Sequence, residues 1–452
     1  MNIALLTPGT GSYHCGVCMR DNALAKELIR QGHGALLLPM YLPLTLDEEA
    51  ASPSAPIFFG GVSTWLREKV PFLRRMPRWL DRMLGARWLL RLLAGRAAKT
   101  GGPEVASMTV SMLRGQEGNQ AAEIEEVVLW LRTAFDGAPP DAVWLATALQ
   151  AGLARRIGAA LNVPVIGFLQ GEDAFIDGLG DRAPEVWTLL AERMRDADAW
   201  ISPSRYFAEQ MARRMNWDSG EAARRIHVIP NGTSLDEAAS VARQRDNVPT
   251  IGYLARFLPG KGVGLRVDAF IVLKRRGGIP RLRLRCAGSM TGDDARYCAS
   301  LRNKLDDAGC AADAEFLPNV SRAEKMAFLR SIDVFSVPAI SSEAFGLYLI
   351  EALAAGVPAV QPRAWSFPEI IEATGGGILF EPGGTPETSA NALADALETL
   401  LRDPDRAKAL GQAGREAVSR NFSMRQMAAA IMEITNTLVK AQPEKTGKSC
   451  EG

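Results

Sequence analysis

Short apolar runs alternate with longer segments of helical periodicity along most of this chain of 452 residues. Apolar runs bounded by Gly, Pro or Asn are typical of buried strands, and the helical segments between them are typical of crossovers in a parallel sheet. The strands predicted in the first half of the chain are 3–6, 142–146, 163–169, 199–202 and 227–229. The alternation therefore predicts an α/β fold with parallel sheets.

The alternation stops in a polar stretch at 236–247 and then begins again. The second set of predicted strands is 250–255, 282–287, 315–317, 334–337, 359–360 and 378–380. Because the chain is also longer than one hydrophobic core usually supports, we expect two doubly wound, Rossmann-like domains. The expected domains are residues 1–235 and 236–422, followed by a helical segment at 423–440 and a disordered tail at 441–452.

Overall composition excludes several classes of protein. A formal charge of +1 gives no global bias toward polyanions, so no nucleic-acid partner is expected. The apolar opening stretch, 2–6, is too short and too soon broken for a signal peptide or a membrane span, which predicts a cytoplasmic protein. The six cysteines are scattered, which fits reduced thiols better than a disulfide framework.

One insertion, 62–99, departs from the alternation. It carries many Arg and Lys residues against only Glu68 and Asp81, with aromatic residues such as Trp65 and Trp79 interleaved. One hypothesis is that it grips an anionic acceptor or lies on the inner membrane surface, as basic amphipathic segments do. The other is that its apolar face packs on its own domain.

The strongest motif is a pair of glutamates, Glu343 and Glu351, that follows the predicted strand at 334–337. Glu343 falls in the loop at the carboxyl end of that strand, where ligands of open α/β sheets bind. A helix is predicted over 345–355, so that the first-turn amides of Phe345, Gly346 and Leu347 suit a phosphate or a sugar oxygen. Two carboxylates in one crevice suit a ligand rich in hydroxyl groups.

A second motif places basic residues after the predicted strand at 250–255. Arg256 and Lys261 lie on one loop that reads Arg-Phe-Leu-Pro-Gly-Lys-Gly. An Arg and a Lys on such a loop can hold a diphosphate leaving group and offset its developing charge.

Together these motifs resemble those of glycosyltransferase family 4, the glycosyl transferases group 1. The segments at 228–232, 284–288, 316–320 and 375–382 resemble further signatures of that family. The resemblance implies a GT-B fold, in which two Rossmann-like domains face each other across the active-site cleft. It also implies that the final helix returns to the amino-terminal domain and that the enzyme retains the anomeric configuration of the transferred hexose.

The resemblance also implies roles for single residues. Glu343, Arg256 and Lys261 are the implied catalytic residues, with the two cations on the diphosphate and Glu343 at the donor sugar. Glu351 is implied to bind the ribose, and the backbone of residues 345–347 to bind the sugar. The remaining implied donor-site residues are Gly11, Gly16 and Val320.

The amino-terminal half departs from the family in one respect. Relatives often carry a His after the strand predicted at 163–169, where this chain has Gln170. Gln170 can hydrogen-bond a sugar hydroxyl but cannot act as a base. Glu172 or Asp173 are candidates to supply charge at this sugar or acceptor site, or they only cap the helix that follows.

We therefore expect a retaining glycosyltransferase that moves a sugar from a UDP-, GDP- or ADP-sugar to a hydroxyl of a glycan, lipid or small molecule. No metal and no cofactor are expected, because no Asp-x-Asp motif follows a strand and Cys15 and Cys18 have no second pair. The alternatives are a protein that binds the nucleotide sugar without transferring it, and a sugar-nucleotide epimerase. The motifs specify neither the sugar, the base nor the acceptor.

Overall fold

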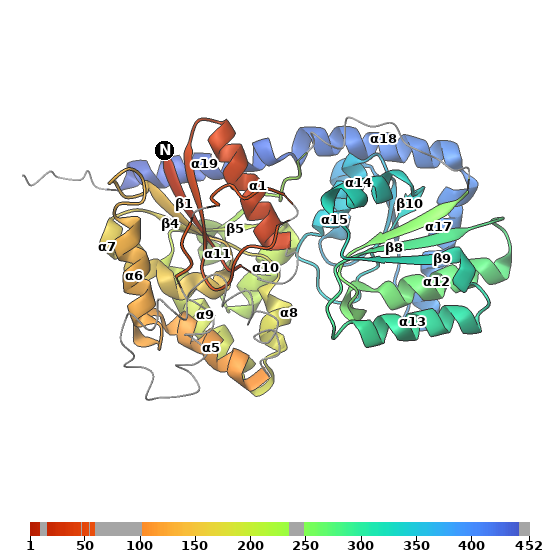
Figure 1. Ribbon diagram of the computed structural model, residues 1–452, viewed down its shortest axis with the longest axis horizontal. Coiled ribbons are helices and arrows are strands. Elements are labelled where there is room, and N and C mark those ends of the chain that lie inside the picture. The colour runs from red at the N-terminus through yellow and green to blue at the C-terminus, as the bar shows by residue number, and fades with distance from the viewer. Residues whose placement is uncertain (10–15, 47, 54, 59–101, 235–247, 443–452) are drawn as a thin grey trace, which may run out of the picture.

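The computed structural model describes residues 1–9, 16–46, 48–53, 55–58, 102–234 and 248–442. The predicted insertion at 62–99, the predicted site residue Gly11 and most of the predicted tail lie outside these residues. The described chain forms two parallel six-stranded sheets, each with helices on both faces, arranged side by side (Figure 1). This architecture confirms the predicted fold class of two Rossmann-like domains.

The amino-terminal sheet has the order β2-β1-β3-β4-β5-β6. Its strands are β1 (Asn2–Thr7), β2 (Gly34–Pro39), β3 (Ala142–Leu145), β4 (Val165–Phe168), β5 (Ala199–Ser202) and β6 (Ile226–Val228). The helices of this domain are α1 (Gly16–Arg30), α5 (Gly102–Arg114), α6 (Ala121–Leu131), α7 (Ala154–Leu161), α8 (Glu172–Asp177), α9 (Ala183–Arg193), α10 (Arg205–Arg214) and α11 (Ser219–Arg225).

Alternate residues of β1 enter two different apolar cores. Ile3 and Leu5 belong to the core beneath α1, whereas Ala4 and Leu6 belong to the core on the opposite face of the sheet. Successive side chains of a strand point to opposite faces, so a strand that is apolar throughout is buried on both sides. The continuous apolar run in the sequence follows from this burial.

The carboxyl-terminal sheet has the order β12-β11-β10-β7-β8-β9. Its strands are β7 (Thr250–Leu254), β8 (Arg283–Gly288), β9 (Ala314–Pro318), β10 (Val334–Phe335), β11 (Ala359–Pro362) and β12 (Gly377–Phe380). The helices here are α12 (Val263–Arg276), α13 (Ala295–Asp307), α14 (Arg322–Arg330), α15 (Leu347–Ala354), α16 (Phe367–Thr374), α17 (Pro386–Arg402) and α18 (Pro404–Asn421).

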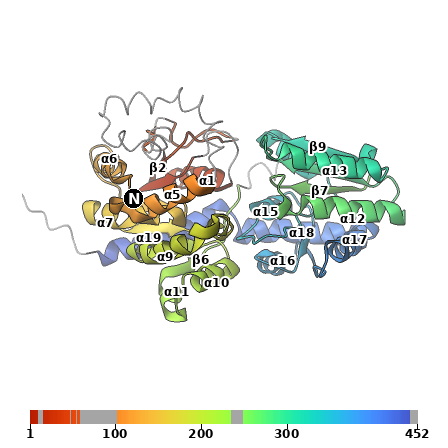
Figure 2. The ribbon, with the colours of Figure 1, turned by 90° about the horizontal axis from the view of Figure 1, so that it is seen from below.

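The last helix, α19 (Met424–Ala441), leaves the carboxyl-terminal domain and runs along the amino-terminal one (Figures 1 and 2). Its residues Met427, Ala428 and Ile431 join the core beneath α1. Ser423 caps the helix by accepting a hydrogen bond from the backbone N–H of Gln426. The chain therefore passes between the domains a second time at the start of α19, and apolar packing holds this helix on the amino-terminal domain.

One observed strand, β2, is absent from the strands predicted from the sequence. β2 reads Gly-Ala-Leu-Leu-Leu-Pro and contains no β-branched or aromatic residue, so its local strand propensity is weak. It becomes a strand by pairing in parallel with β1, from Asn2 opposite Gly34 to Thr7 opposite Pro39. Each strand that was predicted corresponds to an observed strand within a few residues.

The carboxyl-terminal domain contains a fully buried arginine, which lowers the stability of the folded protein. Arg266 on α12 has no exposed surface, and its three side-chain nitrogens have no hydrogen-bond partner among the described residues. Burial lowers the pKa of Arg266 to about 9. Since the folded pKa lies below the unfolded value, the buried charge costs stability in full at neutral pH, and the cost declines as the pH rises above 9.

We therefore predict that Arg266→Leu stabilises the protein at pH 7, by about 1 to 3 kcal/mol, because it removes an unpaired buried polar group. Chemical denaturation at pH 7 measures this gain. The control is Arg276→Leu at the end of the same helix, where Arg276 pairs with Asp395 at 2.7 Å, and this change should not stabilise. A loss of stability in Arg266→Leu would contradict the prediction.

Candidate functional site

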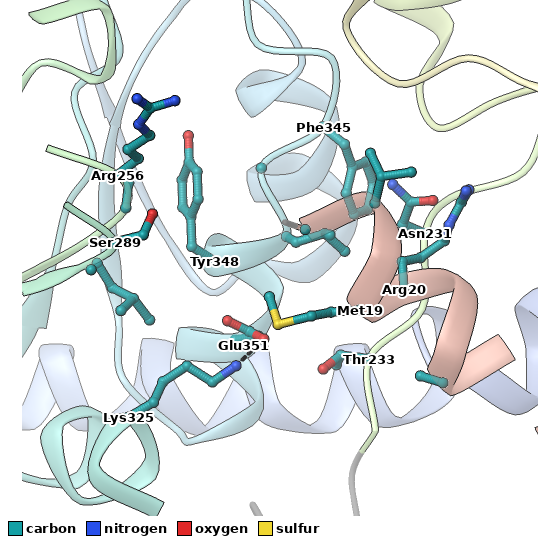
Figure 3. Close-up of a pocket in the computed structure, with 18 of the residues that line it drawn as sticks. Met19, Arg20, Asn231, Thr233, Arg256, Ser289, Lys325, Phe345, Tyr348 and Glu351 are labelled. Carbon is teal, nitrogen blue, oxygen red and sulfur yellow. Dashed lines mark hydrogen bonds and ion pairs between the residues drawn. The ribbon is translucent and has the colours of Figure 1, made fainter. Parts of the chain in front are cut away.

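A cavity of about 430 Å³ lies between the two domains and is lined by both. Its walls include residues that lie within two positions of the end of a strand, such as Gln170 after β4, Ala255 after β7 and Ser289 after β8. The carboxyl ends of parallel strands meet at one edge of a sheet, which is where open α/β sheets bind ligands. The cavity therefore occupies the position expected of a ligand site in both domains (Figure 3).

Glu343 lies in this cavity with 9% of its surface exposed. Its Oε2 is 2.6 Å from Lys261 Nζ and accepts a hydrogen bond of 2.5 Å from Tyr348 OH. Burial, and next the Glu343 carboxylate, raise the pKa of Tyr348 well above its usual value, so the phenol keeps its proton and donates. Sequence analysis predicted Glu343 and Lys261 and missed Tyr348, which stands five positions after Glu343.

The helix that follows Glu343 begins later than predicted. The structure places its first residue at Leu347, so the predicted range 345–355 is wrong at its start. Gly346 is the N-cap with a φ of 89°, a left-handed conformation that favours glycine. Phe345, Gly346 and Leu347 still line the cavity, and the helix still ends before Gly356.

Glu351, on the second turn of α15, forms an ion pair with Lys325 of α14 at 2.9 Å (Figure 3). Both side chains line the cavity. Lys325 was missed because no motif marks it, although its place one turn into the helix after β9 puts it at the same sheet edge. Val320, which was predicted, lines the wall between β9 and α14.

Arg256 lines the cavity from the loop after β7. Its Nε donates to Asp294 Oδ2 at 3.2 Å. Although burial tends to raise it, the pKa of Asp294 lies below its usual value because Thr291 and Arg256 donate hydrogen bonds to the carboxylate. Arg256 is therefore held by an ionised partner, with a third of its side chain still exposed.

Two helix amino termini meet in the cavity. Gly16 is the first residue of α1 and Leu347 is the first residue of α15. A Cβ built on Gly16 would lie 3.6 Å from Leu347 Cδ1, so the two helix starts are in close contact. Helix amino termini carry partial positive charge and free N–H groups, which suits an anionic ligand.

The loop after β4 is organised by Glu172. Its carboxylate accepts hydrogen bonds from the backbone N–H groups of Gln170 at 2.8 Å and Ala148 at 2.9 Å, and from Thr147 Oγ1 at 2.7 Å. Burial raises the pKa of Glu172. This side chain is occupied in holding the loop and is not among the cavity residues. Its partners all precede α8, whose N-cap Gly171 has no side-chain cap, so the prediction that Glu172 caps the following helix is not confirmed.

Gln170 reaches the cavity, whereas the other candidate of this loop does not. Gln170 lines the cavity, and its Nε2 is buried without a hydrogen-bond partner among the described residues. Asp173 is buried at 3% exposure and is not among the cavity residues. The structure therefore brings Gln170, and not Asp173, next to the predicted donor residues.

Within the described ranges, no group of three or more His, Cys, Asp or Glu residues is arranged to hold a metal ion. Among the same residues, no helix is both long and apolar enough to cross a membrane.

Comparison with known families agrees with this geometry. The model described as glycosyl transferases group 1 matches residues 236–417, and the model described as glycosyltransferase family 4 matches residues 110–237. The chain belongs to glycosyltransferase family 4. The two matches together include the cavity residues from Gln170 to Ala354, whereas the cavity residues of α1 and Met424 lie outside them.

Characterised relatives of this glycosyltransferase include mycobacterial enzymes. A GDP-mannose-dependent α-(1-6)-phosphatidylinositol monomannoside mannosyltransferase of Mycolicibacterium smegmatis is 28% identical over 66% of this chain and 75% of the relative. A phosphatidyl-myo-inositol mannosyltransferase of Mycobacterium tuberculosis is 32% identical, over 46% of this chain and 53% of the relative.

Solved structures share the fold at low sequence identity. A sucrose-phosphate synthase from Thermosynechococcus elongatus has a TM-score of 0.67 at 19% identity and covers 98% of this chain and 100% of its own. HepE of Anabaena, in complex with UDP and glucose, has a TM-score of 0.62 at 16% identity, with 97% and 100% covered. These likenesses support the GT-B fold of this family 4 glycosyltransferase.

The position of Lys261 in the cavity predicts that it contributes to binding of the diphosphate part of a nucleotide. We expect Lys261→Met to weaken nucleoside diphosphate binding by about tenfold to a hundredfold, because it removes a charge-assisted contact and leaves Glu343 without its cation. Binding of the nucleoside without phosphates should change little. Calorimetry with GDP, UDP and ADP and their nucleosides measures both effects.

Lys274→Met is the matched control, since Lys274 pairs with Asp313 at 2.7 Å outside the cavity. Equal losses for nucleoside and nucleoside diphosphate in Lys261→Met, with the control unaffected, would contradict a diphosphate site at Lys261.

Proposed function

We propose that this glycosyltransferase transfers a sugar from a nucleoside-diphosphate sugar to an acceptor hydroxyl with retention of configuration and without a divalent metal. One observation carries the proposal: a single cavity holds the cations Arg256 and Lys261 together with the carboxylates Glu343 and Glu351. Cations suit the diphosphate of such a donor, and carboxylates suit the hydroxyls of its two sugars.

The diphosphate is assigned to the space between Arg256, Lys261 and the starts of α1 and α15. Both cations remain about one-third exposed, so a phosphate can reach them. When the bond between the sugar and the diphosphate breaks, negative charge grows on the diphosphate. Preorganised cations and helix amino termini stabilise that charge more than they stabilise the bound donor, which is what acceleration requires.

The two carboxylates are assigned to the two sugars of the donor. Glu351, a turn into α15 and next to the β9 wall, suits the ribose. Glu343, at the start of the motif and beside Lys261, suits the transferred sugar. Its pairing with Lys261 and Tyr348 orients the buried carboxylate before the donor arrives.

The reaction needs no strong protein base in this proposal. The acceptor oxygen forms a bond to the anomeric carbon, the bond from that carbon to the diphosphate oxygen breaks, and the diphosphate takes the electron pair. The proton of the acceptor hydroxyl passes to a diphosphate oxygen. Gln170, which cannot take a proton, is then sufficient as a hydrogen-bond donor at the sugar.

The relatives support a donor and an acceptor class. Several relatives are named as GDP-mannose-dependent, and several are named as acting on phosphatidylinositol or its mannoside. We therefore favour GDP-mannose as the first donor to test and a lipid-linked hydroxyl as the first acceptor. Acceptors of this kind fit an enzyme at the inner membrane face, with the basic stretch 62–99 as the candidate contact.

One observation supports a second candidate function, a protein that binds the nucleotide sugar without transferring it. That observation is Gln170 in place of the His that relatives often carry. Purified protein that binds a nucleotide sugar but neither hydrolyses nor transfers it would favour this second candidate.

We predict that EDTA leaves turnover unchanged, because cations of the protein meet the charge of the diphosphate. The measurement is release of nucleoside diphosphate from the sugar donor, with and without chelator. Activity that EDTA abolishes and magnesium or manganese restores would refute the metal-independent mechanism.

The two glutamates should fail differently when changed to glutamine. Glu351→Gln removes a contact to the unreacting ribose, which should mainly raise the apparent KM for the donor. Glu343→Gln removes a charged contact at the reacting sugar and should cost about 2 to 4 kcal/mol in the transition state, on the order of a hundredfold in kcat.

Turnover kinetics beside calorimetry with the nucleoside diphosphate separate the two effects. Normal turnover in Glu343→Gln together with unchanged nucleotide binding in Glu351→Gln would mean that the donor does not lie on this motif.

A further inference from the structure

The amino-terminal domain holds the residues on both sides of Glu343. Ser204 Oγ donates a hydrogen bond of 2.7 Å to the carbonyl oxygen of Ala344, and Tyr206 OH lies 3.2 Å from Ser342 Oγ. Ala344 is part of the apolar core of the amino-terminal domain, although its neighbours in sequence belong to the other domain. Glu343 therefore stands between two anchor points that the opposite domain provides.

A carboxylate from the carboxyl-terminal domain accepts hydrogen bonds from free N–H groups in the first turn of α10. Glu369 of α16 accepts hydrogen bonds from the backbone N–H of Arg205 at 2.9 Å and of Tyr206 at 2.6 Å. These amides have no partner within the helix, and the helix dipole favours a negative charge at this end. These charge-assisted bonds join the two domains next to residues 342–345, which we call the Glu343 segment.

The same helix supports the Glu343 segment from its other side. Ser366, at the start of α16, donates from Oγ to the carbonyl oxygen of Phe345 at 3.0 Å. The ring of Trp365, next to it, meets the ring of Tyr206 edge to face at 6.0 Å. The position of the Glu343 segment is thus coupled to the position of α10 through one continuous set of contacts.

We propose that Ser204, Tyr206 and Glu369 form an interdomain clamp that fixes Glu343 in its reactive position when the two domains are closed. The inference rests on the proposed function, which assigns Glu343 to the transferred sugar. None of the three residues of the clamp is among those that line the cavity, so we assign them as positioning residues. Separation of the domains breaks the bonds to Ala344 and Ser342 and leaves the segment with only the contacts of its own domain, such as that of Ser366 with Phe345.

A polar clamp suits a cleft that opens in each cycle. Hydrogen bonds between the domains are exchanged for bonds to water on opening, so their net contribution is small and reversible. An apolar contact of similar extent would hold the cleft shut, whereas interfaces between mobile domains are more polar. The clamp can therefore hold the Glu343 carboxylate in place without greatly slowing the release of products.

The test compares Tyr206→Phe and Glu369→Gln with the wild type. GDP-mannose, UDP-glucose and ADP-glucose serve as donor probes, and the release of nucleoside diphosphate is measured. Each variant should lower kcat by about fivefold to tenfold, the effect of one or two lost hydrogen bonds, with nucleoside diphosphate affinity within about twofold of wild type. Glu387→Gln is the control, because Glu387 lies in the first turn of α17 outside the cavity.

The outcomes separate the clamp from the proposed function. A wild-type protein that releases no nucleotide from any donor contradicts the proposed function. Active wild type with unchanged kcat in both variants overturns the clamp alone. A lower melting temperature with kcat and nucleotide affinity reduced in equal measure also overturns it, because that pattern reports general destabilisation. Loss of kcat with nucleotide affinity retained supports the clamp.

Discussion

A buried carboxylate needs cations and hydrogen-bond donors as partners. The buried carboxylate of Glu343 therefore determines which segments have to meet in the cleft. Removing a carboxylate from water costs several kcal/mol unless partners satisfy it. Lys261 and Tyr348 are those partners, and they come from the loop before α12 and from α15. The β7 loop, the end of β10 and the start of α15 must therefore meet at one point.

The parallel sheets make that meeting possible. In each domain the loops that carry function follow the carboxyl ends of strands, and the two sets of loops line one cavity. The crossing at α19 and the contacts of α10 with α16 keep the walls together. A ligand in this space contacts both domains at once, which ties its binding to their relative position.

The sequence predicted the strands well because buried parallel strands are continuous apolar runs with Gly, Pro or Asn at their ends. It missed β2, whose Leu-rich run carries no strand preference and is defined only by pairing with β1. It also placed the start of α15 too early, at Phe345. The left-handed backbone of Gly346 delays the helix, and that conformation depends on the surrounding loop.

The site residues also fall into two groups, those that sequence motifs predicted and those that only the structure identifies. Arg256, Lys261, Glu343 and Glu351 belong to motifs, and the structure brings them to one cavity, although their roles remain predictions. Lys325 and the clamp around Tyr206 stand in no motif, because their relevance comes from contacts between distant segments. Tyr348 lies inside the motif, but its role follows from its contact with Glu343. For Glu172, sequence alone suggested a charge at the site or a cap of the following helix, whereas its four hydrogen bonds hold the loop before that helix.

A structure of the protein with a bound nucleoside diphosphate would show whether the nucleotide occupies this cavity. We expect the diphosphate at Arg256 and Lys261, the ribose hydroxyls on Glu351, and Glu343 free to face the position of the sugar. A nucleotide bound elsewhere, or bound in this cavity with its ribose away from Glu351, would contradict the assignment.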